Sequence, residues 1–209
     1  MIRFFRTTKN HTWWWKQRKL DWRKEYQNWQ HPHRKWIVRA LKSFGWQSLI
    51  EIGCAAGANL IAIVKEMPGR QLGGVDVNEE AIKVASETLV GGLFRVNSAD
   101  DIMLSDKATD VVLSDLCLIY VDPFKIDKYL KEIFRVARNH IVFCEFHTTN
   151  PWKRFWLKVR FGYNAYNWSK LLKKHGCYDI VKYKMPPELW ENEEPQKTFA
   201  YLFIARVPK

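Results

Sequence analysis

Residues 49–60 read Leu49-Ile50-Glu51-Ile52-Gly53-Cys54-Ala55-Ala56-Gly57-Ala58-Asn59-Leu60, a β-rich run that passes through two glycines into a helical pattern. Glycine in such a turn lets the backbone approach a ligand that a Cβ atom would hold away. The next β-rich run ends at Gly74-Val75-Asp76-Val77-Asn78, so an acidic side chain stands at a strand tip, where it can accept hydrogen bonds from a ribose diol. Together the segments predict a nucleoside site at the carboxyl ends of parallel strands.

Two other interpretations of this turn stay open. A dinucleotide-binding turn requires G-x-G-x-x-G, whereas this chain has G-x-x-x-G with Ala55 and Ala58 at the other two glycine positions. A pyrophosphate cradle is therefore a poorer fit. The turn could also serve only to pack a helix onto a strand.

Strand and helix patterns alternate through the middle of the chain, which predicts an α/β fold with a parallel sheet covered on both faces. Helices are predicted by apolar residues at helical spacing and by caps, including Asn78 for one helix and Asp122-Pro123 for another. The polar segment 185–196 is predicted to be a loop outside the core. The predicted strands are 48–52, 72–75, 93–96, 110–114, 140–146, 178–184 and 198–207, and the predicted helices are 36–44, 58–67, 79–89, 122–137 and 167–175.

Composition narrows the function classes. The chain has 209 residues, 47% of them hydrophobic, which is enough for one domain with a sizeable core. No apolar run reaches the ~17–25 residues of a membrane helix, and basic residues interrupt the first twenty positions, so a cytoplasmic protein is expected. The four cysteines lack C-x-x-C spacing, which predicts reduced, packed thiols. His31-Pro32-His33 has no third ligand cluster nearby, so no metal is expected.

The net charge of +12 is concentrated in two flanking segments. Residues 1–46 contain 12 Lys and Arg against two acids and hold seven of the eleven tryptophans, while residues 151–184 contain nine Lys and Arg against one acid. The stretch 12–29 is predicted to be one amphipathic helix. The candidate substrate or surface residues of the two segments are Trp15, Trp22, Tyr26, Trp29, Trp152, Arg154 and Trp156.

Three roles are compatible with these aromatic, basic segments. The aromatic stripe could be core, packed over the cleft as a lid with its lysines in solvent. It could lie on an anionic membrane or bind a lipid-linked substrate. It could also bind RNA through phosphate contacts and base stacking, which we consider the weakest of the three.

Over residues 36–146 the sequence resembles the class I S-adenosylmethionine-dependent methyltransferases, in particular the small domains that act on metabolites, sugars and lipids. The resemblance rests on four motifs in the family's order, which are 51–57, 74–76, 110–123 and 132–145. It implies a Rossmann-like, doubly wound, seven-stranded sheet, mostly parallel with an antiparallel last strand. The terminal pair 178–184 and 198–207 matches that expectation.

The resemblance also implies cofactor contacts for S-adenosyl-L-methionine. Backbone from Gly53 through Cys54, Ala55 and Gly57 would approach the methionine part, with Glu51 supporting the turn. Asp76 and its neighbour Val77 would hold the ribose. In the adenine turn, Ser98 stands where the family has an acid, and Ala99 and Asp101 complete the alignment. Ala55 stands where the family commonly has glycine.

The expected reaction is a direct SN2 transfer of the sulfonium methyl group, in which alignment supplies much of the rate. The leaving group is a neutral thioether, so no acid is needed and a base is optional. Candidate catalytic residues follow the fourth and fifth predicted strands: Asp115, which also counts as a cofactor contact, Cys117, Tyr120, Glu145 and His147. For His147 and Asp115, a purely structural hydrogen bond is the alternative.

The sequence therefore predicts a methyltransferase with a basic, Trp-rich helical leader at 1–46 and a cofactor domain at 47–209, whose substrate insertion covers about 148–170. The expected acceptor is a hydroxyl, amine or carboxyl of a small metabolite, sugar or lipid-linked molecule. The motif [Asp/Asn]-Pro-Pro-[Tyr/Phe] is absent after the fourth strand, which disfavours base N-methylation. The alternatives are an RNA methyltransferase or RNA-binding protein, and an inactive cofactor-binding partner subunit.

Overall fold

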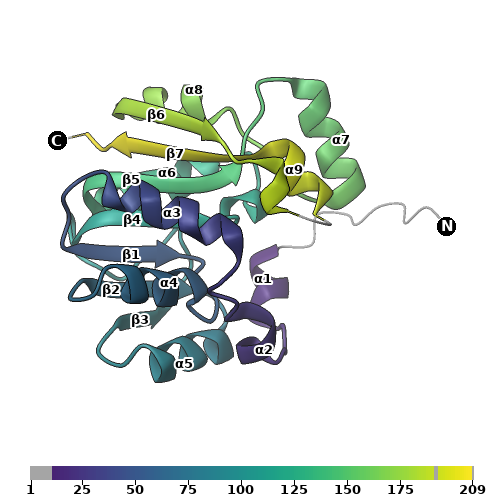
Figure 1. Ribbon diagram of the computed structural model, residues 1–209. Helices are drawn as coiled ribbons and strands as arrows, with labels where there is room; N and C mark the ends of the chain where they lie inside the picture. The colour runs from purple at the N-terminus through teal and green to yellow at the C-terminus, as the bar shows by residue number, and fades with distance from the viewer. Residues whose placement is uncertain (1–10, 191–192, 209) are drawn as a thin grey trace.

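A seven-stranded sheet in the order β3-β2-β1-β4-β5-β7-β6 forms the centre of the molecule (Figure 1). The computed structural model describes residues 11–190 and 193–208. β1 pairs in parallel with β2 and β4, β2 with β3, and β4 with β5, while β7 runs antiparallel to both β5 and β6. The predicted fold class is confirmed. The strands are β1 (Ser48–Ile52), β2 (Gln71–Asp76), β3 (Leu93–Val96), β4 (Thr109–Asp115), β5 (Ala137–Phe146), β6 (Tyr178–Lys184) and β7 (Ala200–Arg206).

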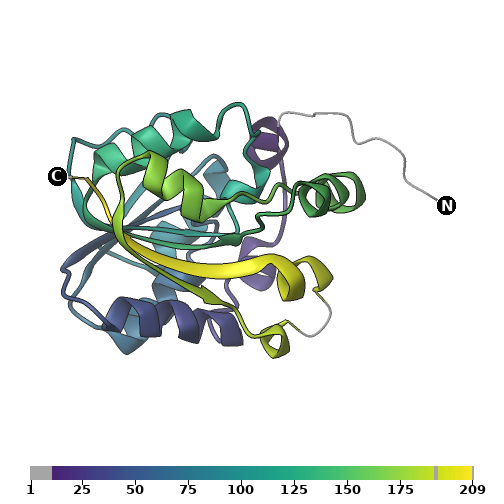
Figure 2. The same cartoon turned by 90° about the horizontal axis from the view of Figure 1, so that it is seen from above.

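Helices cover both faces of the sheet (Figure 2). On one face, α3 (Pro32–Lys42), α4 (Ala58–Glu66) and α5 (Glu79–Thr88) bury apolar residues in one hydrophobic cluster. On the other face, α6 (Ile126–Val136) and α8 (Trp168–Lys174) contribute to a second cluster. The central strands β1 and β4 are therefore covered on both sides, and most of their residues are buried.

The helix predicted over 12–29 is broken in the structure into α1 (His11–Lys16) and α2 (Trp22–Tyr26). Asp21 starts α2 by accepting a hydrogen bond from the Lys24 N–H. The Asn78 side chain donates to the carbonyls of Trp15 and Arg18, in the segment where the helix stops. A tertiary contact and a local cap thus outweigh the helical periodicity. The part of the predicted leader at residues 1–10 lies outside the described residues.

Two further predictions were wrong in detail. Asp122 does not cap α6; its side chain accepts from the Phe124 N–H in a turn, and the helix begins at Ile126. The segment 185–196 is not peripheral, because it contains the short helix η2 (Pro187–Leu189) and the start of α9 (Glu194–Phe199) and buries Met185, Trp190 and Pro195. Met185 and Trp190 are 0% and 1% exposed. They are single apolar residues among polar ones, so periodicity does not reveal them.

Glu145, near the end of β5, holds the loop that follows β4. Its Oε1 accepts hydrogen bonds from the Ser114 hydroxyl at 2.7 Å and from the backbone N–H groups of Cys117 and Leu118 at 3.0 Å. The side chain is fully buried, and burial raises the pKa of Glu145 to about 8. The residue therefore connects β4 and β5 under the loop instead of facing solvent.

We expect Glu145→Gln to preserve the fold, because the amide oxygen can accept the same three hydrogen bonds. Glu145→Ala leaves these donors unsatisfied and should lower the free energy of unfolding by about 2–4 kcal/mol. The raised pKa also stabilises the wild type below the unfolded value of 4.5, and this stability is lost as the pH rises through about 8. Urea unfolding at pH 5.5 and 8 should show a smaller loss for Glu145→Gln than for the wild type. An equal loss in both would contradict this assignment.

Trp190→Ala should lower the free energy of unfolding by about 3–5 kcal/mol, because it leaves a cavity beside α3. The matched control is Trp156→Ala, since Trp156 is 62% exposed and its removal should change stability by less than about 0.5 kcal/mol. Guanidinium titration followed by circular dichroism measures both. Equal, small effects would show that segment 185–190 does not belong to the core.

Candidate functional site

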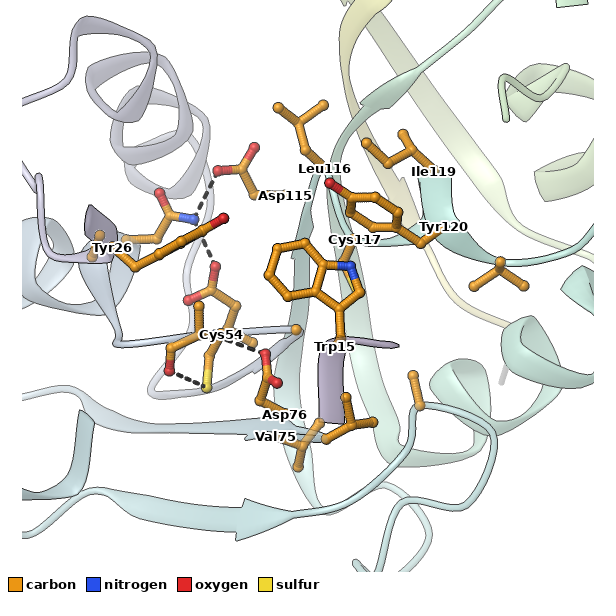
Figure 3. Close-up of a pocket in the computed structure, with 18 of the residues that line it drawn as sticks. Trp15, Tyr26, Cys54, Val75, Asp76, Asp115, Leu116, Cys117, Ile119 and Tyr120 are labelled. Atoms are coloured by element: carbon orange, nitrogen blue, oxygen red, sulfur yellow. Dashed lines mark hydrogen bonds between the residues drawn. The ribbon is translucent and has the colours of Figure 1, made fainter. Parts of the chain in front are cut away.

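A cavity of about 440 Å³ lies at the carboxyl ends of β1, β2 and β4. Its walls come from the turn after β1, the end of β2, the loop after β4, the helices α1 and α2, and the start of α3. In Figure 3 the side chains of Asp76, Asp115, Trp15 and Tyr120 surround this space. The order reversal between β1 and β4 creates the opening, as in other parallel α/β sheets.

In the turn after β1, every second residue has a left-handed backbone conformation, with φ of 69° at Gly53, 45° at Ala55 and 82° at Gly57. The N–H groups of Gly53 and Cys54 both donate to the Val75 carbonyl, which ties the turn to β2. A Cβ atom on Gly53 would overlap the Cys117 side chain, so this position requires glycine. Ala55 adopts the left-handed conformation at a cost of about 1–2 kcal/mol, and the turn keeps its shape despite the missing glycine.

Asp76 closes the turn from the end of β2. Its Oδ2 accepts from the Ala55 N–H at 3.0 Å and its Oδ1 from the Asn78 N–H at 2.9 Å. Burial raises the pKa of Asp76 above its ordinary value, although these backbone hydrogen bonds oppose the shift. Asp76 and its neighbour Val77 both line the wall of the cavity, and each carboxylate oxygen has capacity for a further hydrogen bond. The carboxylate is placed to accept two hydroxyl hydrogen bonds.

Asp115, at the end of β4, holds the start of α3 and of α4 together. Its Oδ2 lies 2.9 Å from His33 Nε2 and accepts from Asn59 Nδ2 at 2.9 Å and from Arg34 Nη1 at 3.3 Å. Burial disfavours the charge, but His33, Arg34 and the Asn59 hydrogen bond outweigh it and hold the pKa of Asp115 well below its usual range. Asp115 is therefore an ionised carboxylate inside the cavity wall.

Two buried carboxylate oxygens beside this cluster have no hydrogen-bond partner among the described residues, Oδ1 of Asp115 and Oε2 of Glu51. Asn59 Nδ2 donates to the other Glu51 oxygen at 2.6 Å. Burial raises the pKa of Glu51 to about 8. Such orphaned acceptors are costly unless a ligand satisfies them. Both residues line the cavity, so an ammonium group bound there would lie beside them as a hydrogen-bond donor, whereas a sulfonium group, which has no N–H, would interact only through its charge.

At the other end of the cavity the predicted adenine turn is divided. Ser98 and Ala99 line the wall, together with Asn97. Asp101 is exposed and does not line it. Ser98 Oγ pairs with Asp100 Oδ1, and Lys128 Nζ forms an ion pair with Asp100 Oδ2 at 2.9 Å. Asp100, one residue before the predicted Asp101, is therefore the acid of this turn that forms side-chain contacts, and its partner Lys128 lies on α6.

Aromatic side chains form the wall opposite the glycine turn. The ring of Trp15 packs edge-on against Tyr26 at 6.0 Å and Tyr120 at 5.3 Å, and Tyr163 packs on Tyr120 at 5.6 Å. Trp22 is 3% exposed and also lines the cavity. The hydroxyl of Tyr120 is largely desolvated, which raises its pKa far above the ordinary value. Tyr120 is therefore a neutral hydrogen-bonding group at neutral pH.

The other predicted residues lie elsewhere. Glu145 serves the loop described above, and His147 Nδ1 lies 3.1 Å from the Tyr166 carbonyl and 3.2 Å from the Trp168 nitrogen, outside the cavity lining. Burial lowers the pKa of His147 to about 4. Trp29 stacks under Lys65, and Trp152, Arg154 and Trp156 lie on α7 (Pro151–Phe161), away from the cavity.

Sequence reasoning missed the histidine pair at the start of α3. His31 and His33 lie 2.5 Å apart through their Nδ1 atoms, both line the cavity, and Trp190 stacks on His33 with ring centroids 4.5 Å apart. Burial and the neighbouring His33 lower the pKa of His31 to about 4. The sequence did carry a signal, since Pro32 between the histidines favours a helix start. It did not indicate that Asp115, 82 positions later, would be the partner.

Comparisons with known proteins agree with this geometry. Residues 49–140 match the family described as a methyltransferase domain. No curated protein matches the sequence. Within the described residues, no helix is long and apolar enough to cross a membrane.

Several solved structures share the fold at low sequence identity. A Haemonchus contortus phosphoethanolamine N-methyltransferase, solved with phosphomonomethylethanolamine and S-adenosylhomocysteine, superposes with a TM-score of 0.65 at 16% identity over 85% of this chain. The present chain spans about half of that protein, 53%. A Streptomyces coelicolor geranyl diphosphate C-methyltransferase gives 0.67 at 14% identity, covering 84% of this chain and 75% of its own.

A Haloferax volcanii putative methyltransferase, solved with the Trm112 activator, gives a TM-score of 0.66 at 16% identity, covering 86% of this chain and 90% of its own. The family match, the strand order and the placement of the glycine turn beside an acidic strand end lead to the same assignment. The resemblance found in the sequence is confirmed over residues 49–140, which match a methyltransferase domain.

Proposed function

We propose that this chain transfers a methyl group from S-adenosylmethionine to a small metabolite bound against Tyr120. The observation that carries the proposal is the convergence of the glycine turn, Asp76 and Asp115 on one cavity. Each supplies what one part of the cofactor requires: close backbone approach, a diol acceptor and an anionic partner for an ammonium group.

Within this proposal, the cofactor contacts are assigned by position. Backbone from Gly53 to Gly57 and the free oxygens of Glu51 and Asp115 would hold the methionine part. Asp76 would accept from the ribose hydroxyls, and Ser98 and Ala99 would lie beside the adenine. Asp101 is not part of the proposal because it does not line the cavity. When bound, the cofactor supplies an electrophilic methyl group.

The cavity favours a small acceptor or the small end of a larger one. Its volume of about 440 Å³ is near the lower end of the range of roughly 300–1,000 Å³ for small-molecule sites, and the cofactor itself must fit within it. The relatives solved with acceptors methylate chemically unlike molecules and share 14–16% of their residues with this chain, so neither acceptor is transferred to it.

The residues of the cavity favour an acceptor atom that needs little help from a base. Asp115 has a lowered pKa and Tyr120 a strongly raised one, so neither accepts a proton readily near pH 7. His31, with a pKa of about 4, is a neutral but weak base. Glu51, with a pKa raised to about 8, is mostly protonated at pH 7, and its Oε1 already accepts from Asn59. A carboxylate or a neutral amine already presents a lone pair. We therefore favour amine or carboxyl acceptors over unactivated hydroxyls.

Residues 11–31 would act as a lid in this mechanism. Gln27 Nε2 donates to the Ala56 carbonyl and to Thr88, and Arg23 forms an ion pair with Glu87 on α5. These contacts, with Trp15 and Trp22, place the segment over the glycine turn. By excluding water it would strengthen the electrostatic contacts around the sulfonium group. α3 is not part of the lid, because Ile37 and Leu41 are buried in the main core.

Asp76→Asn should weaken binding of S-adenosylmethionine and S-adenosylhomocysteine by about 10- to 100-fold, because it removes a charge that accepts from the ribose. The matched control, Asp101→Asn, changes an exposed acid outside the cavity and should bind as the wild type does. Isothermal calorimetry measures all three proteins. If the wild type bound neither S-adenosylmethionine nor S-adenosylhomocysteine, the proposal would be wrong. Cofactor binding without turnover until a partner is added would indicate that the chain is an inactive cofactor-binding subunit.

His31→Gln should reduce methyl transfer by less than about tenfold and leave its pH profile unchanged, because the proposed acceptor needs no base and His31 does not contact Asp115. The assay follows transfer of radiolabel from the methyl-labelled cofactor to pooled amines and carboxylic acids. A loss of about 100-fold or more, with a shifted pH profile and unchanged cofactor affinity, would instead assign a proton-accepting role to His31.

A further inference from the structure

Helix α7 presents its apolar side to solvent. Trp152, Phe155, Trp156 and Val159 are 72%, 55%, 62% and 59% exposed, while Leu157 on the opposite side is 2% exposed. The four exposed residues follow the spacing i, i+3, i+4, i+7 and therefore form one stripe spanning about 100° of the helix surface. A surface helix of a water-soluble protein normally packs such an apolar stripe against the core.

Cations border the stripe and no acid lies within the helix. Lys153 and Arg160 stand along one edge, and Arg154 and Lys158 along the other. Tryptophan and phenylalanine flanked by lysine and arginine are the residues that place a helix in the headgroup region of a bilayer. Aromatic rings enter the boundary with the acyl chains, and the cations remain with the phosphates.

We propose that α7 docks this protein on anionic lipid bilayers, with the stripe of Trp152, Phe155, Trp156 and Val159 lying in the headgroup region. Charge complementarity selects this occupant, because the helix carries four cations and no acids. The inference does not depend on the proposed acceptor, since it rests only on the exposed face of one helix. Binding would be peripheral, because α7 has 11 residues and a length of about 16 Å.

The helix is connected to the wall of the cofactor cavity. Lys158 Nζ donates to Asn164 Oδ1, and Asn164 Nδ2 donates to the carbonyls of Ile119 and Val121 on either side of Tyr120. α7 projects from the body of the molecule at the same end as α1 and α9 (Figures 1 and 2). A bilayer contacting α7 would therefore face the end of the sheet where the cavity opens.

The experiment is flotation of the full chain with vesicles of phosphatidylcholine containing about 30% phosphatidylglycerol, and with vesicles of phosphatidylcholine alone. We expect preferential binding to the anionic vesicles that weakens on raising the salt from about 0.05 to 0.5 M. W152A/W156A should lose at least about tenfold in affinity. K153Q/R160Q should lose about 25-fold, on the basis of about fivefold per cation near an anionic surface.

The matched controls are Phe124→Ala, which removes an aromatic ring that is 98% exposed outside α7, and Lys131→Gln on α6. Both should bind vesicles as the wild type does. Unchanged thermal unfolding and S-adenosylhomocysteine binding would show that the α7 variants fold. If they do not fold, the binding of the wild type to the two kinds of vesicle still tests the proposal.

Equal binding to both vesicle types, or equal binding by the α7 variants and the controls, would overturn the proposal. Two specific results would replace it. If the wild type ignores vesicles and W152A/W156A converts a dimer into a monomer in light scattering, the stripe is an interface between copies of this chain. If the same variants lose affinity only for a single-stranded RNA oligonucleotide, the stripe stacks on bases.

Discussion

The carboxylate of Asp115 connects the parts of the molecule that must meet for the cavity to exist. It stands at the end of β4 and accepts from residues at the starts of α3 and α4, which are far apart in the sequence. Removing one partner of such a buried ionic cluster is costly, because the remaining charge stays desolvated. The position of α3, and with it His31 and the entry of the lid segment, depends on this cluster.

The two sides of the cavity differ chemically, because different elements of the fold form them. The glycine turn, Glu51, Asp76 and Asp115 form an acidic side, on which Asp115 is ionised. One carboxyl oxygen of Glu51 and one of Asp115 lack a hydrogen-bond partner among the described residues. The lid, Tyr120 and Tyr163 form an aromatic side. In the proposed complex the ammonium group of the cofactor would lie beside Asp115, and the sulfonium methyl group would lie toward the aromatic side. Methyl transfer from a sulfonium group requires alignment more than proton removal, so the lowered pKa values of Asp115 and His31 are compatible with it.

Several functional assignments from the sequence depend on the direction in which a side chain points, and the sequence pattern does not contain that direction. Glu145 lies near the end of β5 and His147 directly follows this strand, yet Glu145 lies under the loop after β4 and His147 lies against Tyr166 and Trp168. Neighbouring residues of a strand point to opposite faces, and a residue at a strand end can turn toward the core or toward the cleft. Asp100 and Asp101 also differ in their surroundings: Asp100 pairs with Ser98 and Lys128, whereas Asp101 is exposed. The tryptophans of the two basic segments also separate: Trp15 and Trp22 cover the cavity, whereas Trp152 and Trp156 face solvent.

The sequence by itself determined the α/β alternation, the glycine turn, the acidic strand end at Asp76 and the cap at Asn78, because these depend on local spacing and on backbone conformations that few residues adopt. Only the tertiary structure decided that Asn78 would break the predicted leader helix, that Trp190 would be core and that His33 would reach Asp115. These outcomes arise from contacts across 60 or more positions, such as the Asn78 bond to Arg18 and the His33 pair with Asp115. Such contacts form where the folded sheet brings buried polar groups together, and local periodicity carries no record of them.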